Sequence, residues 1–207
     1  MKRRFTLLLW ILIVGTVAPL AETLFIINAD KAREEASFGT KSLIRRAHEQ
    51  MAEMRQARLD SLREQMLDEV TSYIKKVAPT SYEALPACMV EQCLENELDL
   101  CFMLSQTQLE TCFGTLGMGR ATSRYSMFGV SRRYTSYENC IADYVALLKS
   151  NYLVNGRTEQ DLMKNYVNGG GYRYASSPTY EEELSATYKK VVKSTNIRDL
   201  QRQYAAL

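Results

Sequence analysis

The sequence has few of the residues that build metal and redox sites. It contains one histidine, His48, and no two of its cysteines are spaced as a CxxC pair. Zinc sites in proteins need several Cys, His or carboxylate ligands at short and regular spacings. The sequence therefore argues against a metal site, and we expect no cofactor.

The cysteines number five, which is an odd count. At least one thiol is therefore unpaired, and the sequence leaves the pairing of the others open. Free cysteines are among the most buried side chains of folded proteins. We expect these residues to be small buried hydrophobic side chains with at most one disulfide bridge among them: Cys88, Cys93, Cys101, Cys112 and Cys140.

The chain also lacks a strong excess of charge of either sign. Its 26 lysines and arginines outnumber its 24 aspartates and glutamates by two, which gives a formal net charge of +2. Nucleic-acid-binding domains depend on concentrated positive charge, so we expect no nucleic-acid partner. At 207 residues, the chain has room for one folded domain with appendages.

No charged residue interrupts residues 5–21, which follow a basic tripeptide at residues 2–4. Apolar residues resume after Glu22, at residues 23–27, so the run is long enough to span roughly 30 Å of hydrocarbon as a helix. A cleavable signal peptide needs small residues before the cut, and Pro19 disrupts both candidate cleavage sites.

We therefore predict an uncleaved signal anchor over residues 1–29. The alternative is a cleaved signal and a secreted protein. Because positive charge precedes the span, the positive-inside rule places the remaining chain outside the cytoplasm. The expected location is the inner membrane, with the domain on the periplasmic or extracytoplasmic side.

Proline and glycine are absent from residues 41–76. Apolar residues recur there at spacings of three to five, as on one face of an amphipathic helix: Leu43, Ala47, Met51, Met54, Leu59, Leu62, Met66, Val70 and Ile74. The heptad pattern slips between Met54 and Leu59, which weakens a coiled-coil interpretation. We predict a helical stalk over residues 30–78 that either self-associates through residues 41–76 or lies against the folded domain.

Pro79 and Pro86 break the helical pattern and mark the start of a folded domain over residues 79–207. No convincing run of alternating strand residues follows, apart from a short piece at residues 128–134. The domain is therefore expected to be mainly α. Further helices are predicted where capping residues precede apolar residues at helical spacing: after Ser136, after Thr158 and, with Pro178 at the first helical position, after Ser177.

A largely apolar helix is expected over residues 98–114, and it finishes on an acid, Glu110, shortly before Gly114. Burial among apolar neighbours disfavours the ionised form of a carboxyl and raises its affinity for protons. A carboxylic acid kept protonated in this way suits a general acid that donates to the leaving oxygen of a glycosidic bond. The alternative interpretation of Glu110 from these residues alone is a solvated surface residue.

Four short segments, in a shared order, resemble the motifs of one enzyme family. Residues 106–114, QTQLETCFG, are similar to the AQxxLESGWG-type motif of glucosaminidase-family peptidoglycan hydrolases of the flagellar-muramidase and Bax type. Residues 126–130 resemble the family's NLFGI segment, and residues 134–148 resemble its YxSxxExxxDYVxLL helix. Residues 171–180 are similar to its GYATDPxY element, so the resemblance covers about residues 89–192.

The resemblance implies a lysozyme-like fold with little or no β-lobe. It also implies cleavage of the β-1,4 bond after N-acetylglucosamine in the glycan of peptidoglycan, by hydrolysis or a transglycosylase-like reaction, with Glu110 as the general acid. Tyr174 aligns with the family tyrosine that faces the acid. The other expected substrate-binding residues, whose rings stack on sugar faces or whose polar groups hold N-acetyl groups, are Phe128, Tyr125, Tyr134, Ser126 and Gln106.

The chain departs from the family pattern beside the acid and after Phe128. Thr111 and Cys112 replace the usual Ser-Gly pair, and Phe113 stands where tryptophan is common. Five residues separate Phe128 from Tyr134. Many family members insert a small β-lobe there, and that lobe carries a second functional carboxylate. In this chain that carboxylate has no counterpart.

Three routes for the second half of the reaction stay open as a result. Asp99 or Glu138 could approach the site, the N-acetyl group of the substrate could act as nucleophile, or a muramic acid hydroxyl could close an anhydro ring. The enzyme would open or remodel the wall, in bacterial growth or in phage lysis. The alternative functions are a catalytically degenerate module that binds glycan or a partner on a membrane-anchored stalk, and a purely structural anchored protein.

Overall fold

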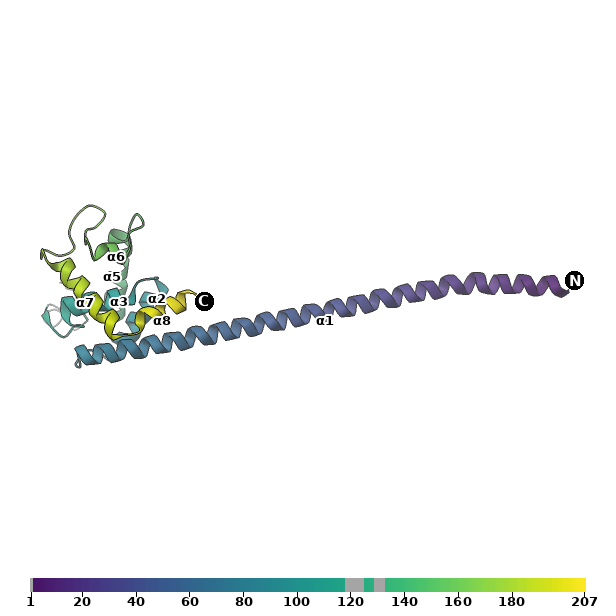
Figure 1. Ribbon diagram of the computed structural model, residues 1–207, viewed down its shortest axis with the longest axis horizontal. Helices are drawn as coiled ribbons and strands as arrows, with labels where there is room; N and C mark the ends of the chain where they lie inside the picture. The colour runs from purple at the N-terminus through teal and green to yellow at the C-terminus, as the bar shows by residue number, and fades with distance from the viewer. Residues whose placement is uncertain (1, 118–124, 129–132) are drawn as a thin grey trace. The chain divides into compact units, whose positions relative to one another are not determined.

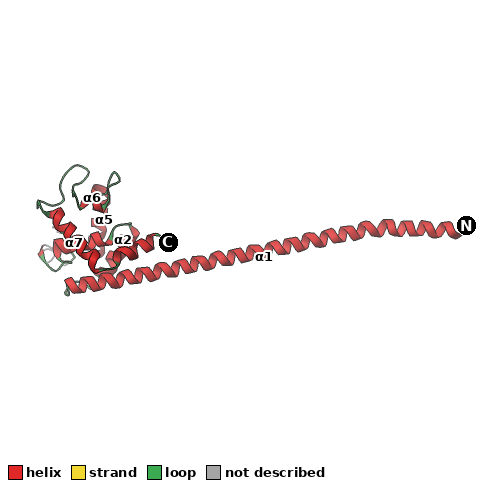
Figure 2. Cartoon of the chain, in the orientation of Figure 1, coloured by secondary structure: helices red, strands yellow, loops and turns green. Residues whose placement is uncertain are grey.

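The structure is a computed structural model that describes residues 2–117, 125–128 and 133–207. Within residues 2–40 it describes the side chains of Asn28 and Lys31 only. The described residues are mainly helical, as the sequence predicts, and they form no strand (Figures 1 and 2). An isolated β-bridge joins Val167 and Arg173. The chain divides into two compact units, Met1–Gln56 and Ala57–Leu207.

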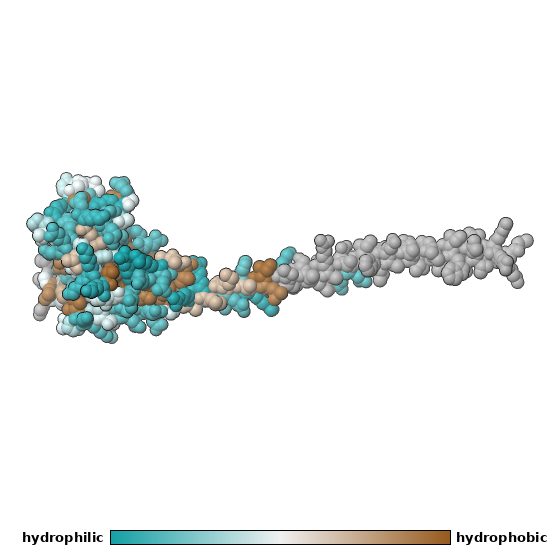
Figure 3. Space-filling view, in the orientation of Figure 1, coloured by the Kyte–Doolittle hydropathy of each residue, from teal (hydrophilic) through white to brown (hydrophobic). Residues whose placement is uncertain are grey.

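Helix α1 (Lys2–Val77) accounts for the first unit and continues into the second. The predicted signal anchor falls largely on residues whose side chains lie outside the described part of the chain. Among the described residues, no helix combines the length and the apolar character that a membrane crossing requires. Apolar side chains do appear on the described surface of this unit (Figure 3), where Leu43 is 65% exposed and Met54 is 73% exposed. Self-association through residues 41–76 stays a prediction.

The second unit takes the last part of α1 into its core. Apolar residues at every fourth position of this part are buried: Leu62, Met66, Val70 and Ile74. Residues spaced in this way share one face of a helix, so the predicted apolar face is confirmed for this part of the helix. The compact unit begins at Ala57, before the predicted domain boundary at Pro79. The prolines mark the end of the helix, whereas the core begins where its apolar face becomes covered.

Helix α3 (Leu100–Thr111) lies at the centre of this unit. It packs against α7 (Tyr180–Ser194), α2 (Leu85–Glu95) and α8 (Ile197–Ala205). Every residue from Leu100 to Thr107 is buried, as expected of a helix that core side chains surround on all sides. Asp99 caps its first turn, because its carboxylate accepts hydrogen bonds from the backbone N–H groups of Cys101 and Phe102.

Helix α5 (Tyr137–Leu147) packs against α2 and continues into a π-helical turn, η1 (Leu148–Tyr152). The sequence predicts the start of α5 correctly, since the Ser136 hydroxyl accepts a hydrogen bond from the backbone N–H of Asn139 at 3.3 Å. It also predicts α6 (Glu159–Leu162), where Thr158 and Asp161 form a capping box.

The start of the last predicted helix is wrong by two residues. Helix α7 begins at Tyr180 rather than at Pro178, and Thr179 precedes it. The carbonyl oxygen of Ser177 accepts a hydrogen bond of 3.0 Å from Arg173, so it is engaged outside the helix. The charges follow the prediction, with three glutamates in the first turn and Lys193 in the last, where they complement the helix dipole.

The five cysteines are all free thiols. Four of them are buried and Cys112 is half-buried, so they pack as the small hydrophobic residues that the sequence predicts. The short piece of strand expected at residues 128–134 falls mainly on residues 129–132, which lie outside the described residues.

Candidate active site

Gln106 and Glu110 stand one turn apart near the end of α3. Residues four apart share a helix face, with their Cβ atoms about 5–6 Å from each other. Gln106 is fully buried, whereas Glu110 is half-buried. The helix stops just beyond the acid, because Cys112 and Gly114 adopt positive φ values of 46° and 76°. The acid therefore sits where the central helix leaves the core.

The carboxyl of Glu110 is held by Tyr180, the first residue of α7. The Tyr180 hydroxyl donates a hydrogen bond of 2.5 Å to Glu110 Oε1. Burial raises the pKa of Glu110 by penalising its charged form, and the bond from Tyr180 opposes this shift only in part. This is the direction that the sequence predicts. The hydrogen bond from Tyr180 engages Oε1 of Glu110.

Stacked phenol rings surround this hydrogen bond. Tyr174 stacks on Tyr166 with ring centroids 4.5 Å apart and an angle of 13°, and it lies 5.6 Å from the ring of Tyr180. The hydroxyl of Tyr174 donates to the carbonyl oxygen of Phe128 at 3.2 Å. Burial raises the pKa of Tyr174 and of Tyr180, so both phenols stay neutral. The structure thus brings Tyr174 and Phe128 into the neighbourhood of Glu110.

Gln106 anchors the inner side of this cluster. Its Oε1 accepts hydrogen bonds from the hydroxyls of Tyr144 and Tyr166, the latter at 3.0 Å. Its Nε2 is buried and finds no partner among the described residues. Gln106 and Ser126 have no exposed surface. Gln106 therefore supports the surroundings of the acid from inside.

The remaining aromatic residues of the predicted site lie in other surroundings. The ring of Tyr125 packs against Tyr82 and Tyr137, with centroids 5.8 and 5.0 Å away. The hydroxyl of Tyr134 donates to Asp143 of α5 at 3.1 Å. These contacts tie Tyr125 to Tyr82 and Tyr137, and Tyr134 to α5. The roles of Tyr125 and Tyr134 in substrate binding stay predictions.

The segment that carries Phe128 is tied to the end of α3 by Thr111. The Thr111 hydroxyl donates to the carbonyl oxygen of Met127 at 2.8 Å and accepts a hydrogen bond from the backbone N–H of Gly114 at 2.9 Å. A hydroxyl is required for both bonds. The replacement of serine by threonine beside the acid therefore keeps the group that this position uses.

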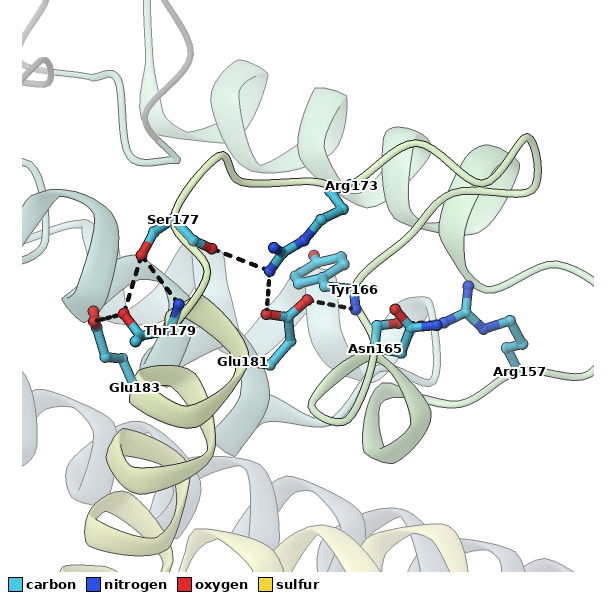
Figure 4. A network of polar contacts seen from close by, with 8 residues as sticks. All are labelled: Arg157, Asn165, Tyr166, Arg173, Ser177, Thr179, Glu181 and Glu183. Carbon is cyan, nitrogen blue, oxygen red and sulfur yellow. Dashed lines mark hydrogen bonds and ion pairs between the residues drawn. The ribbon is translucent and has the colours of Figure 1, made fainter.

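A polar network fixes the first turn of α7, and with it Tyr180 (Figure 4). Glu181 accepts a hydrogen bond from the backbone N–H of Tyr166 at 3.1 Å and pairs with Arg173 at 2.6 Å. Thr179 donates to Glu183 at 2.6 Å. Glu181 follows Tyr180 in sequence, and its carboxylate binds the Arg173 guanidinium and the backbone N–H of Tyr166. Glu181 therefore holds the start of α7 against the segments that carry Tyr166 and Tyr174.

The acids proposed as a second catalytic group are engaged elsewhere. Asp99 caps the opposite end of α3 and accepts a 2.6 Å hydrogen bond from Tyr188. Glu110 lies eleven positions further along the chain, which corresponds to about 16 Å at the helical rise. This distance exceeds the roughly 6.5–9.5 Å between the carboxyls of inverting glycosidases. The geometry therefore excludes Asp99 as the partner of Glu110.

Glu138 is occupied at the start of α5. Hydrogen bonds from Ser136, from its own backbone N–H and from the Cys88 thiol lower the pKa of Glu138. This is the environment of a carboxylate that stabilises a helix start. No other carboxylate is among the groups that perturb Glu110. Among the described residues, no three Cys, His, Asp or Glu side chains gather as metal ligands.

Comparison with models of known protein families gives no match, and comparison with curated proteins gives none either. The resemblance to glucosaminidases therefore rests on the residues and on their order in the sequence. The structure adds the surroundings of those residues.

Sequence reasoning missed Tyr180 and Tyr166, which contact the residues closest to the predicted chemistry. Tyr180 is 70 positions from Glu110 in sequence, and no local periodicity links residues so far apart. Tyr166 has the spacing of a core residue, and it is indeed fully buried. A signal for Tyr180 was present in the resemblance itself, since it is the final tyrosine of the segment similar to GYATDPxY.

Proposed function

We propose that this chain is a glycoside hydrolase that cleaves β-1,4 bonds of the peptidoglycan glycan, with Glu110 as the general acid. The supporting observation is the carboxyl at the end of α3, which is half-buried, raised in pKa and oriented by Tyr180. An acid that stays protonated toward neutral pH is what the leaving oxygen of a glycosidic bond requires. The helical core around α3 suits a lysozyme-like domain.

In the proposed reaction the two oxygens of Glu110 have separate tasks. Oε1 accepts the hydrogen bond from Tyr180 and is thereby fixed in place. Oε2 carries the proton and transfers it to the glycosidic oxygen as the C–O bond breaks, which leaves a carboxylate on Glu110. Tyr180 stabilises that carboxylate, because a neutral phenol donates more strongly to a charged acceptor. The electron-deficient sugar is then captured by water, by its own N-acetyl group or by a neighbouring hydroxyl.

The N-terminal sequence supports an extracytoplasmic location for this activity. The basic residues at positions 2–4 and the uncharged run at positions 5–21 have the pattern of a signal anchor. We place the domain on the outer side of the inner membrane, where peptidoglycan is the adjacent polymer. The part of the predicted stalk that precedes Ala57 would set the distance of the domain from the bilayer.

The decisive experiment compares the full chain with Glu110→Gln in a zymogram that contains peptidoglycan. The parent should clear the gel, and the variant should lose at least about a hundredfold in activity, as expected when a general acid is removed. Glu182→Gln is the matched control, since Glu182 is exposed on α7. Equal clearing by the parent and Glu110→Gln contradicts the assignment. Binding to wall material without cleavage by the parent favours the glycan-binding module.

A further inference from the structure

The part of α1 that precedes the second unit carries apolar side chains that nothing in the described part of the chain covers. Every residue from Leu43 to Arg58 is exposed. The large apolar residues among them are Leu43, Ile44, Met51 and Met54, with Ile44 52% and Met51 68% exposed. Apolar surface is visible on this unit in Figure 3. Contiguous apolar residues on a surface mark an interaction site, whereas single ones need no explanation.

The spacing of these residues indicates that their partner is a helix. Ile44, Ala47, Met51 and Met54 follow one another at intervals of three, four and three residues. These intervals are those of the a and d positions of a heptad. A stripe centred on a and d is narrower than the face that a helix turns toward a globular core, and it is the seam of a coiled coil. We call these four residues the stalk seam.

The slip in the heptad pattern separates the stalk seam from the face that the core covers. Leu59 follows Met54 by five residues, which turns its side chain about 140° away from that of Met54 around the helix. From Leu62 onward the apolar face is buried in the core of the second unit. The single helix α1 therefore has two apolar faces in succession, and only the second of them is covered within the chain.

The stalk seam ends at Arg58. The next a and d positions are Arg58 and Ser61, which are polar. The guanidinium of Arg58 donates a hydrogen bond of 3.0 Å to the side chain of Gln203 in α8, so Arg58 is engaged within the second unit. The seam from Ile44 to Met54 is thus roughly two heptads long, which is short for a coiled coil that forms in dilute solution.

A second copy of the chain fits the stalk seam when the two helices run parallel and in register. In that arrangement each g position faces an e position of the other helix, five residues further along. Leu43 then faces His48, and Gln50 faces Arg55. Neither pair joins two charges of the same sign, and the amide oxygen of Gln50 can accept a hydrogen bond from the guanidinium of Arg55. The flanks of the seam are therefore compatible with an identical partner.

We propose that the stalk seam pairs with the stalk seam of a second copy in a parallel, two-stranded coiled coil. The proposal rests on the proposed function for the membrane anchor alone. Two chains anchored in one bilayer start from the same level, which favours the parallel arrangement, and anchoring raises their effective concentration. This concentration compensates for the short seam. The paired stalk carries two copies of the second unit, each with its own Glu110.

Oxidative cross-linking of the full chain in membranes tests the proposal. Ala47→Cys introduces a thiol at a d position, where the two helices meet, and copper phenanthroline oxidises two such thiols to an intermolecular disulfide. Ala52→Cys is the matched control, because Ala52 is an exposed alanine of the same helix at an outward b position. We expect Ala47→Cys to cross-link at least ten times faster than Ala52→Cys. The parent chain gives the background from the native thiols.

A second substitution shows whether the seam itself causes the cross-link. Met51→Glu, added to Ala47→Cys, places two carboxylates opposite each other in the seam, where like charges repel. We expect it to slow cross-linking to the rate of Ala52→Cys. Met51 is exposed, so the core of the second unit is untouched.

Three results would overturn the proposal. The first is an equal rate for Ala47→Cys and Ala52→Cys. The second is a fast rate that Met51→Glu leaves unchanged. The third is an Ala47→Cys thiol that does not cross-link and is also protected from a water-soluble maleimide, which would show that the bilayer or another protein covers the seam.

Failure of the pairing is distinguishable from failure of the proposed activity. Glu110→Gln, added to Ala47→Cys, should leave the cross-linking rate unchanged. If the chain does not cleave peptidoglycan but the seam cross-links, the stalk pairs and the hydrolase assignment is wrong. If the chain clears the zymogram and the seam does not cross-link, the hydrolase assignment stands and the stalk is a single helix.

Discussion

The burial that suits Glu110 to donate a proton also costs the folded state free energy. Its folded-state pKa is raised, so the native protein binds more protons than the unfolded chain does. Stability therefore falls as pH rises from the unfolded value toward the folded one. We expect Glu110→Gln, which can still accept the bond from Tyr180, to raise Tm by a few degrees at pH 7.

The difference in Tm between the parent and Glu110→Gln should vanish below about pH 4, where the carboxyl is protonated in both states. Calorimetric scans across pH measure it. Glu182→Gln removes an exposed carboxylate and should leave Tm unchanged. A parent that is more stable than Glu110→Gln at pH 7 would show that the carboxylate is solvated, and the case for a general acid would be lost.

Tyr180 controls the same acid through one hydrogen bond. That bond lowers the pKa of Glu110 against the larger effect of burial, so Tyr180→Phe should raise the pKa further. Activity needs protonated Glu110, and the basic limb of the pH–rate profile should therefore move to higher pH. We expect kcat to fall by about 10- to 100-fold, because the carboxyl is no longer held in position.

Tyr188→Phe is the control for this variant on the same helix. Its hydroxyl donates to Asp99 at 2.6 Å, at the opposite end of α3. The Tyr188→Phe substitution should lower the free energy of unfolding without moving the basic limb of the pH–rate profile. If the pH–rate profiles of Tyr180→Phe and Tyr188→Phe coincide, Tyr180 contributes only packing.

At the scale of elements, the last turns of α1 belong to the core of the second unit. Leu62, Met66, Val70 and Ile74 are fully buried or nearly so, and burial of each such side chain contributes about 1.5–3 kcal/mol. A fragment of residues 57–207 should therefore unfold cooperatively. The free energy of unfolding of a fragment of residues 79–207 should be lower by on the order of 6 kcal/mol, which equals the total stability of many domains. Urea denaturation followed by circular dichroism compares the two, and equal midpoints would contradict this account.

Most helices could be predicted because their signals are local. Ser136 and the pair Thr158 and Asp161 cap α5 and α6 as the sequence indicates. The start of α7 could not be predicted, because Arg173 engages the carbonyl of Ser177, and this contact depends on the tertiary fold. The compact unit begins at Ala57, before the boundary predicted at Pro79. The sequence does not reveal this start, because the apolar face of α1 has the same pattern whether solvent or core covers it.

The residues of the candidate site could also be predicted only in part. Glu110 could be predicted from the apolar helix that ends on it and from the resemblance, and Tyr174 from the resemblance alone. Gln106 and Ser126 could be selected from the motifs. Their complete burial could not be predicted, because a position in a motif does not tell how far a side chain lies from the surface. Tyr125 was predicted to bind substrate because it lies in a segment that links helices around the expected cleft. Its ring contacts are with Tyr82 and Tyr137. The contact with Tyr82 joins residues more than 40 positions apart and could not be predicted from that placement.

For the whole molecule, the remaining prediction concerns its location. A reporter enzyme that is active only outside the cytoplasm, fused after residue 40, should be active and should sediment with membranes. The same fusion without residues 1–29 should be inactive and remain in the soluble fraction, since it lacks the basic and apolar segments. Reporter activity that does not depend on residues 1–29 would remove the support for an anchored, exported domain.

The five free thiols have a consequence for how such a protein matures. Burial raises the pKa of Cys88 and of Cys101 to about 12 and that of Cys140 to about 11, and a protonated thiol is a poor nucleophile. Folding therefore shields these three thiols from oxidants and from small disulfides in the surroundings of the protein. Once the unit has folded, an oxidising compartment should leave them reduced.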